Sequence, residues 1–573
     1  MSTFKVPGDN KQIVQSNNGD YAGNVWSTFN IDLDSNPGVI KTSKRLTRVL
    51  GPDDIGSQVV QALQIHDGFY YLATNSDVYR CSVNSDPTDN SNWSDVSTFG
   101  ADDLGFESDL TSFNGLLLVS LGTDIASWDG STKDADWWTN VASGTALTAD
   151  VPHIMEVVQS QKETLYVTNG ESVHYYEKDG TEQIVELDSF QKAGTLAPGL
   201  SGSMWVGSYT EVGNNAYVYE IRTNEVVDST PVYNQAYAID GRAALSVFMY
   251  KNTPFVITER GYIQVFNGAG FETIAQFPWA NGSSVMQGAR PGLVQDSPTS
   301  KAIHPKGARV RGDKCFIYVD ASDEYGDNTL LSNRGASGVW VLDLKTFSLT
   351  HRYGLTQAST DFGVQKVNRS GPLLITNTPQ TRIMVGGDID NDGVWMESDD
   401  TPQGYFVTVR HEANSIADKF EKFVIKTDTL ATSDSITVKY KDVSKPNLPL
   451  NINNITWKDN TRFTTTNALT GVSVGDEVEI VAGHYAGSIA TITKIEGGTT
   501  KTVTVDTTFG TLNETSDVRI DAWKIIKVLD ATNTEKFVIG GSELSPSRQY
   551  KVILKGDITV REVISKSNSG EEL

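Results

Sequence analysis

The chain has 573 residues, 50 glycines and a formal net charge of −24. This length exceeds what a single hydrophobic core usually covers, and it predicts two or three domains. The acidity argues against binding of nucleic acid or of an anionic membrane through a general electrostatic footprint. Abundant glycine and turn-forming residues, with few segments of helical periodicity, favour an all-β protein.

The first residues lack the apolar stretch of a secretion signal, and no apolar run is long enough to span a bilayer. Cys81 and Cys315 match no metal-binding or redox spacing, which indicates buried thiols in a reducing compartment. We therefore expect synthesis and folding in a cytoplasm, and no membrane anchor.

Residues 1–20 are polar and predict an N-terminal arm. The stretch 24–50 that follows contains a strand, an Asn-Pro-Gly turn at 36–38 and a second strand. We expect this hairpin to complete the last unit of a ring of β repeats by pairing with strands near residue 395. Such rings commonly close on themselves so that no strand edge stays free.

The stretch 110–132 contains three short strands separated by tight turns, and Asn114-Gly115 is a strong hairpin signal. A meander of this kind cannot bury both of its faces alone, so it needs copies of itself beside it. Copies with the same order of strands and turns occupy 62–83, 157–180, 246–271 and 308–349, with weaker ones at 202–221 and 382–397.

The second strands of these repeats align on seven positions: Tyr71, Leu118, Tyr166, Val206, Val256, Ile317 and Met384. Successive positions lie 47, 48, 40, 50, 61 and 67 residues apart. Propeller blades repeat every 40–50 residues or so, and the two long steps require loop insertions. The sequence therefore predicts a six- or seven-bladed β-propeller over residues 21–403.

An acidic loop in the last repeat is the clearest site-like motif. Asp388, Asp390 and Asp392 precede Gly393 as in the opening of a calcium loop, and Asp399 stands where the closing glutamate is expected. No helical pattern flanks the loop, so we favour a turn between two strands. Ca²⁺ binding by these four residues is the alternative, and we expect no other cofactor.

Motifs typical of enzymes do not occur. The seven histidines are dispersed, and no P-loop, nucleophile elbow or dinucleotide fingerprint is found. Asp320, Asp323 and Glu324 lie in a polar insertion that favours a solvated loop over a glycosidase site. Aromatic pairs could stack on sugars but are better explained by packing between blades; they are Tyr70-Tyr71, Trp137-Trp138 and Tyr175-Tyr176.

After residue 403 the pattern changes to that of a β-sandwich, which we assign to 404–456 and 524–565. Between its halves, 457–523 contains a phrase that resembles the small SH3-like barrels of the KOW type. Such barrels often bind RNA, but here Lys494 stands against three acidic residues, Asp476, Glu477 and Glu479.

We therefore expect the inserted barrel to bind protein. The residues that we expect at this interface are Val474, His484, Tyr485 and Ile489. The last residues, 566–573, have the composition of a flexible tail.

The opening phrase at 31–40, with its Asp-Leu-Asp-Ser and Pro-Gly-Val-Ile, precedes the repeats. Two blades end in Trp128-Asp129-Gly130 and Phe266-Asn267-Gly268, and the acidic loop runs over 388–396. Together with the sandwich, these features resemble the propeller-bearing virion proteins of tailed bacteriophages, of the tail nozzle, tail-tip or neck type.

The resemblance implies a non-enzymatic structural protein of the virion. It implies a homo-oligomeric ring that contacts other tail or neck proteins and binds no specific nucleic acid sequence. The alternative is a glycan-binding or glycan-cleaving propeller that recognises a host surface. An enzyme of that kind would need converging acids or a metal on the axial face of the propeller.

Overall fold

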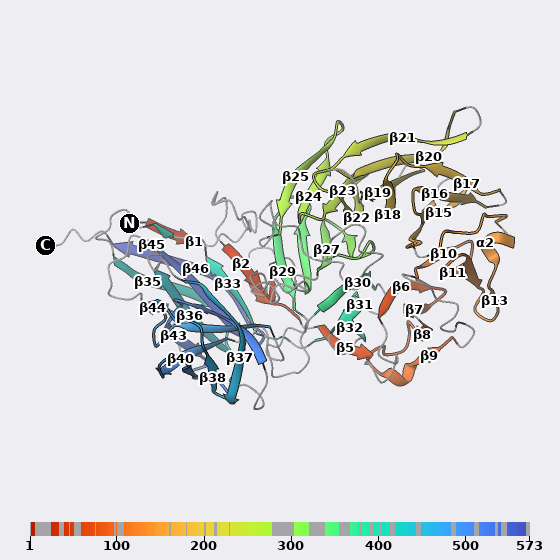
Figure 1. Ribbon diagram of the computed structural model, residues 1–573. Helices are drawn as coiled ribbons and strands as arrows, with labels where there is room; N and C mark the ends of the chain where they lie inside the picture. Colours follow the sequence, from red (N-terminus) through yellow and green to blue (C-terminus); the bar gives the residue numbers. More distant parts are fainter. Residues whose placement is uncertain are drawn as a thin grey trace.

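The computed structural model of the protein describes residues 2–5, 25–33, 39–44, 46–50, 59–74, 76–96, 99, 108–140, 142–149, 151–159, 162–178, 180–199, 202–210, 215–227, 230–277, 303–319, 338–354, 367–376, 381–389, 393–399, 401, 403–408, 411–412, 419–442, 448–482, 489–508, 515–532, 537–539 and 547–568. Two bodies make up the chain, a ring of β blades and a smaller all-β body that contains both termini (Figure 1). The helices in these ranges are single turns, η1 (Asn90–Asn92) and α2 (Trp137–Asn140). Neither has the length or the apolar character that crossing a bilayer requires.

The ring is a β-propeller in which the described residues form seven four-stranded antiparallel sheets. The first four blades are β6–β9 (Val60–His66, Phe69–Thr74, Val78–Ser82, Trp93–Asp95), β10–β13 (Leu110–Phe113, Leu116–Ser120, Ile125–Trp128, Lys133–Asp134), β14–β17 (Met155–Gln159, Glu163–Asn169, Ser172–Glu177, Gln183–Glu186) and β18–β21 (Gln191–Pro198, Ser203–Thr210, Tyr217–Val227, Thr230–Ala238).

The fifth and sixth blades are β22–β25 (Ala244–Tyr250, Thr253–Thr258, Tyr262–Phe266, Phe271–Gln276) and β26–β29 (Ala308–Arg311, Lys314–Val319, Gly338–Asp343, Leu349–Tyr353). The seventh combines β30 (Val367–Ile375), β31 (Ile383–Ile389) and β32 (Gly393–Glu397) with β5 (Leu46–Leu50) from near the N-terminus.

The first strand of each blade lies nearest the axis. These inner strands contact one another in the order β6, β10, β14, β18, β22, β26, β30 and back to β6, which closes the ring. All seven positions that the sequence repeats align on, from Tyr71 to Met384, lie on the second strands of successive blades. The predicted β-propeller is thus confirmed.

The ring closes through β5, which pairs antiparallel with β32. In this register Leu46 lies opposite Glu397, and Leu50 lies opposite Val394. Leu46 is fully buried in a core that it shares with Tyr353 and Trp395. The predicted pairing near residue 395 is therefore found, although only β5, the last five residues of the 24–50 stretch, takes part in it.

The rest of that stretch belongs to the second body. Two six-stranded sheets pack face to face there: one contains β1 (Ser2–Lys5), β3 (Ile31–Asp32), β4 (Ile40–Thr42), β46 (Thr559–Asn568), β35 (Lys419–Thr427) and β44 (Phe537–Ile539), and the other contains β2 (Val25–Phe29), β33 (Gly404–Thr408), β34 (His411–Glu412), β45 (Ser547–Lys555), β36 (Ser435–Asp442) and β43 (Lys524–Asp530).

The domain boundaries predicted near the N-terminus therefore differ from the structure. Residues 1–20, predicted as an arm, include β1, which pairs with β46, and the range 21–403 assigned to the propeller begins with three strands of the sandwich. The reason is burial: Ile31, Leu33 and Ile40 all lie in the sandwich core. Hydrophobic alternation shows that a strand has a buried face, but not which domain buries it.

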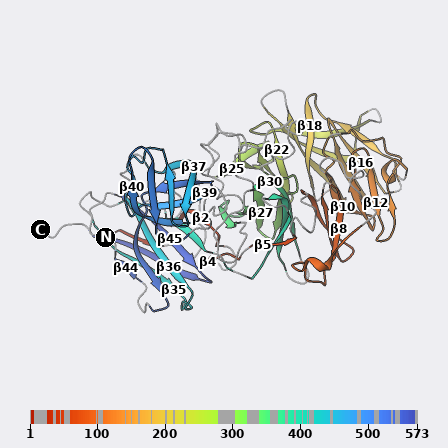
Figure 2. The same cartoon turned by 60° about the horizontal axis from the view of Figure 1, so that its bottom comes forward.

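The inserted barrel is a closed six-stranded sheet made of β37 (Leu450–Asp459), β38 (Arg462–Thr465), β41 (Lys501–Val505), β40 (Ile489–Glu496), β39 (Glu477–Ala482) and β42 (Thr515–Asp521). It lies against the sandwich (Figure 2). It begins before the predicted boundary of 457, because β37 pairs with both β38 and β42 and is needed for closure. At the C-terminus, β46 extends into the predicted tail as far as Asn568.

Ring closure at Gly393 can be tested by a matched pair of substitutions. Gly393 has a φ of +141°, and a Cβ there would lie 2.1 Å from the carbonyl oxygen of Leu50 in β5. At Gly268, φ is +95° and a Cβ would meet nothing within 4 Å. Gly268→Ala should cost roughly 1 kcal/mol of unfolding free energy from its φ alone, and Gly393→Ala about 1–3 kcal/mol more, because it pushes β5 from β32.

Urea denaturation of the two variants, followed by tryptophan fluorescence, provides the measurement. Equal midpoints for Gly393→Ala and Gly268→Ala would show that the β5–β32 contact does not limit the stability of the ring.

Candidate functional site

A buried turn fills one region of the propeller axis. Residues 303–307, here called the axial segment, precede β26 and are all buried. The carbonyl oxygen of Pro305 accepts hydrogen bonds from Thr195 Oγ1 at 3.4 Å and Ser246 Oγ at 2.9 Å, in β18 and β22. The carbonyl oxygen of Lys306 accepts one from the amide of Leu373 in β30 at 3.0 Å. The axial segment thus touches the fourth, fifth and seventh blades.

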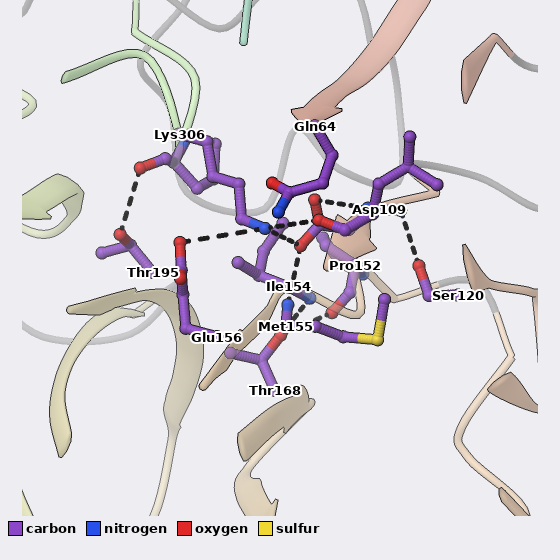
Figure 3. A network of polar contacts seen from close by, with 12 residues as sticks. Gln64, Asp109, Ser120, Pro152, Ile154, Met155, Glu156, Thr168, Thr195 and Lys306 are labelled. Atoms are coloured by element: carbon purple, nitrogen blue, oxygen red, sulfur yellow. Dashed lines mark hydrogen bonds and ion pairs between the residues drawn. The ribbon is translucent and has the colours of Figure 1, made fainter. Parts of the chain in front are cut away.

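The side chain of Lys306 extends to two further blades (Figure 3). Its Nζ lies 2.7 Å from Oδ2 of Asp109, immediately before β10, and 3.8 Å from Oε1 of Glu156 in β14. It also donates to the carbonyl oxygen of Leu110 at 3.0 Å. The ammonium and the Asp109 carboxylate are 4% and 1% exposed, so this ion pair is almost completely shielded from water.

Backbone amides hold the Asp109 carboxylate on both oxygens. The amide of Leu110 donates to Oδ1 at 2.8 Å, and that of Met155 donates to Oδ2 at 2.7 Å. Burial raises the pKa of Asp109 above its ordinary value, while Lys306 and the Met155 amide act in the opposite direction. Glu156 is more exposed, and Arg309 lies 3.5 Å from its Oε1.

A glycine makes the axial turn possible. The amide of Gly307 donates to the carbonyl oxygen of His304 at 2.7 Å, and a Cβ at position 307 would lie 2.9 Å from that oxygen. A larger residue would open the turn that aims Lys306 at Asp109. The partners of the segment lie in or next to the inner strands β10, β14, β18, β22 and β30, which surround the axis.

A second buried charge cluster joins the sandwich to the barrel. Glu477 of β39 accepts from Lys439 of β36 and from Lys551 of β45, each at 2.6 Å, and all three side chains are at most 3% exposed. Burial opposes ionisation of this carboxyl, but the two ammonium groups outweigh it and lower the pKa of Glu477 to about 2. Lys441 and Asp521 form a flanking ion pair at 2.8 Å.

A third polar contact joins the sandwich to the sixth blade of the propeller. Arg352 of β29 lies 3.0 Å from Asp32 of β3, with both side chains largely buried. Next to it, Asn30 accepts from the amide of Gly354 at 2.5 Å and donates its own amide to His351 Nδ1 at 3.3 Å. The stretch that contains β2 and β3 thus connects the two bodies.

The residues of the predicted calcium loop are not brought together in the part of the chain that the structure describes. Asp390, Asp392 and the side chain of Asp388 lie outside the described residues. Asp399 lies beyond the far end of β32 from Gly393, and that strand spans roughly 13 Å. Its carboxylate is 2.9 Å from Lys44. Because calcium ligands lie within about 2.6 Å of one ion, Asp399 does not belong to a loop that precedes Gly393. Binding by the other three stays a prediction.

The predicted interface of the barrel is described in part. Val474 is 59% exposed and precedes Gly475, whose φ is +92°. Ile489 is half-buried and pairs with Glu479 at the beginning of β40. His484 and Tyr485 lie outside the described residues. The three acidic residues that the sequence sets against Lys494, namely Asp476, Glu477 and Glu479, are buried.

Sequence reasoning missed a histidine network in the third blade. His174 Nδ1 lies 2.5 Å from Oε1 of Glu182, and its Nε2 lies 3.0 Å from Ser172 Oγ and 2.9 Å from Asn169 Nδ2. Burial alone would raise the pKa of Glu182, but the bonds from His174 and Thr145 lower it below the usual range.

A serine, histidine and carboxylate in this order could carry out nucleophilic chemistry if a substrate reached them. Ser172 is 7% exposed and His174 is 3% exposed, and the serine hydroxyl donates to the carbonyl oxygen of Asn169. The network is therefore packed inside the blade. The aromatic pairs that we assigned to packing are also buried, including Tyr70, Tyr71, Trp138 and Tyr175.

Comparison with known proteins gives one family match, in the barrel. Residues 474–506 match the KOW motif family, in agreement with the resemblance seen in the sequence. No curated protein matches the chain.

Among solved structures, the chain is similar to the computationally designed Ika8 protein, with 11% identity, a TM-score of 0.34 and coverage of 62% of this chain and 99% of that one. It is also similar to the Neurospora crassa Pan2 WD40 domain, with 8% identity, a TM-score of 0.37 and coverage of 62% and 96%. For the WD40 beta propeller domain of Doa1 the identity is 9%, the TM-score 0.25 and the coverage 39% and 84%.

The barrel–sandwich cluster predicts a large loss of stability on neutralisation of its carboxylate. Glu477→Gln leaves two buried ammonium groups without a counter-charge, which should cost about 3–5 kcal/mol of unfolding free energy. Replacing the whole cluster by Lys439→Met, Glu477→Leu and Lys551→Met should recover most of that loss, because neither ammonium group of the cluster is then buried without its carboxylate. Urea titration measures both.

The exposed pair of Lys494 and Glu496 provides the control, since both of its side chains are more than half exposed. Glu496→Gln should change the unfolding free energy by less than about 0.5 kcal/mol. A loss in Glu477→Gln as small as this would show that the cluster is not a determinant of stability.

The same cluster predicts a pH dependence. The folded pKa of Glu477, about 2, lies below its ordinary value of 4.5. The stability that it contributes is therefore complete above pH 4.5 and is lost as the pH falls towards about 2. The difference in unfolding free energy between the wild-type protein and Glu477→Gln should shrink across this window. A difference that stays constant down to pH 2 would contradict the assignment.

Proposed function

We propose that this protein is a non-enzymatic structural component of a tailed-phage virion, most closely of the tail nozzle or tail-tube-associated type. In this role it forms a homo-oligomeric ring and joins neighbouring tail or neck proteins. It is made in the host cytoplasm and functions in the virion.

The observation that carries the proposal is that buried charges fix the modules of the chain in one orientation. Glu477 with Lys439 and Lys551 holds the barrel on the sandwich, and Arg352 with Asp32 holds the sandwich on the propeller. Charges removed from water stabilise only when their geometry is kept, so such contacts specify orientation more than they add affinity. A component that must keep its shape within a particle needs that property.

The axial segment, which occupies one region of the propeller axis, favours the structural role over the glycan-binding alternative. A ligand on the axial face would meet the axial segment, whose Lys306 is already paired with Asp109 and Glu156. A glycosidase needs two carboxyl groups that a sugar can reach. Asp109 does not meet this requirement, because its side chain is 1% exposed.

The barrel offers a surface for partners at the turn that carries Val474. Its face with Glu477 and Glu479 is occupied by the sandwich, while Val474 is among the most exposed large apolar side chains described. Burial of one such side chain at an interface contributes about 1.5–3 kcal/mol. We therefore place the proposed contact with partner proteins on the side of the barrel that carries Val474.

A charged residue at this position should weaken assembly. Val474→Lys is expected to weaken self-association, or incorporation into particles, by roughly tenfold or more, without a change in the urea midpoint. Light scattering after size exclusion and immunodetection in purified particles provide the measurements. Thr499→Lys, in the exposed turn after β40, is the control and should assemble normally.

Two results would contradict the proposal. One is a wild-type chain that is monomeric and is missing from washed particles. The other is specific binding to an immobilised glycan by a chain that is absent from particles, which would favour the propeller as a recognition module.

A further inference from the structure

The axial network brings an amine, a carboxyl group and a second carboxyl group to one buried point. Nζ of Lys306 lies 2.7 Å from Oδ2 of Asp109 and 3.8 Å from Oε1 of Glu156 (Figure 3). We propose that Lys306 and Asp109 condense to an intramolecular isopeptide bond, with Glu156 as the proton carrier. This modification is independent of the proposed role in a virion.

Burial prepares the two reacting groups. An ammonium and a carboxylate each lose their hydration at this depth, so transfer of one proton from Lys306 to Asp109 gives a neutral amine and a neutral acid at lower desolvation cost. The raised pKa of Asp109, caused by its burial, acts in the same direction. A neutral amine is a nucleophile, whereas an ammonium is not.

The fold also holds the Lys306 amine next to the Asp109 carboxyl group. The carbonyl oxygen of Leu110 accepts a hydrogen bond from Lys306 Nζ at 3.0 Å and holds the nitrogen beside the carboxyl group. The amides of Leu110 and Met155 bind the two oxygens of Asp109 at 2.8 and 2.7 Å. These donors polarise the carbonyl and stabilise the negative charge that develops on oxygen when nitrogen adds to Cγ. Holding the groups in contact replaces the entropy cost of a bimolecular encounter.

The atoms of the reaction balance without another reactant. The Lys306 amine attacks Cγ of the protonated Asp109, and a C–N bond forms. Glu156 takes a proton from the attacking nitrogen and delivers it to the departing hydroxyl group. The Cγ–O bond breaks, one water leaves, and an amide remains. The ammonium and carboxylate together are neutral before the reaction, as the amide and water are after it.

The bond would cross the propeller axis. It joins the beginning of the second blade, at Asp109, to the axial segment that precedes the sixth blade. The second to fifth blades would then lie within one covalently closed loop. The exposed fractions of the two side chains, 4% and 1%, indicate that water reaches the amide poorly.

Intact mass measured under denaturing conditions tests the proposal directly. The wild-type chain should be lighter than its sequence by one water molecule. Trypsin should fail to cut after Lys306, and a branched peptide should join residues 302–309 to residues 81–133. A wild-type chain with the full sequence mass would overturn the proposal, and folding of a variant does not enter this measurement.

Variants then assign the groups. Lys306→Arg keeps the charge but removes the amine nucleophile, and it should have its full sequence mass. A mass deficit of one water that persists in Lys306→Arg would overturn the proposal, because the water would then be lost in a reaction that does not use the lysine, such as succinimide formation at an aspartate.

Glu156→Gln should form little of the cross-link, so most of that variant should have its full sequence mass. If all of it were lighter by one water, the proposed role of Glu156 would be overturned. Lys314→Arg is the matched control. The ammonium of Lys314 lies 3.8 Å from Asp343 but is 24% exposed. This variant should be lighter than its sequence by one water, as the wild-type chain is.

Discussion

The structure depends on the fact that a small twisted sheet cannot bury both of its faces by itself. Each four-stranded blade leaves two apolar faces, and only a neighbouring blade of the same shape covers them. A ring satisfies this requirement for every blade at once, provided that the last blade is complete. Here its completion depends on β5, which is far from β32 in sequence and hydrogen-bonded to it in space. The chain therefore returns its N-terminal region to the ring, and the sandwich is built from the strands that lie on either side of this return.

Charged groups in the interior must also find partners. Lys306, Glu477 and Arg352 each lie where two or more β units meet, and each is paired because an unpaired charge at such depth would cost several kcal/mol. Apolar contacts between β modules tolerate sliding, since their energy depends mainly on buried area. A buried ion pair does not tolerate it, because its energy falls sharply with distance. A few buried ion pairs thus set the relative positions of the modules, while many apolar contacts supply their stability.

The sequence predicted the repeats well because local signals encode them. Turns such as Asn114-Gly115 and alternating apolar residues mark each meander, and the seven aligned positions all lie on second strands. The short outer strands, such as the two-residue β13, have too little pattern to be seen. The assignment of Ile31 and Ile40 failed because alternation does not name the partner sheet. Asp109, Glu156 and Lys306 lie far apart in sequence, so no spacing rule joins them. Only the repeat alignment could have indicated that Asp109 and Glu156 lie at or next to the starts of successive inner strands.

The pairing of β1 with β46 and of β5 with β32 also sets a schedule for synthesis. The first fifty residues leave the ribosome long before their partners exist. At translation rates of roughly 5–20 residues per second they wait for tens of seconds. During that time the six blades encoded between them can form, but the ring stays open and the N-terminal strands have no sheet to join. A chain cut short before β46 therefore leaves the sandwich incomplete, and a chain cut short before β32 leaves the ring open as well. The sandwich is therefore completed after the propeller, because β46 is synthesised later than every strand of the ring.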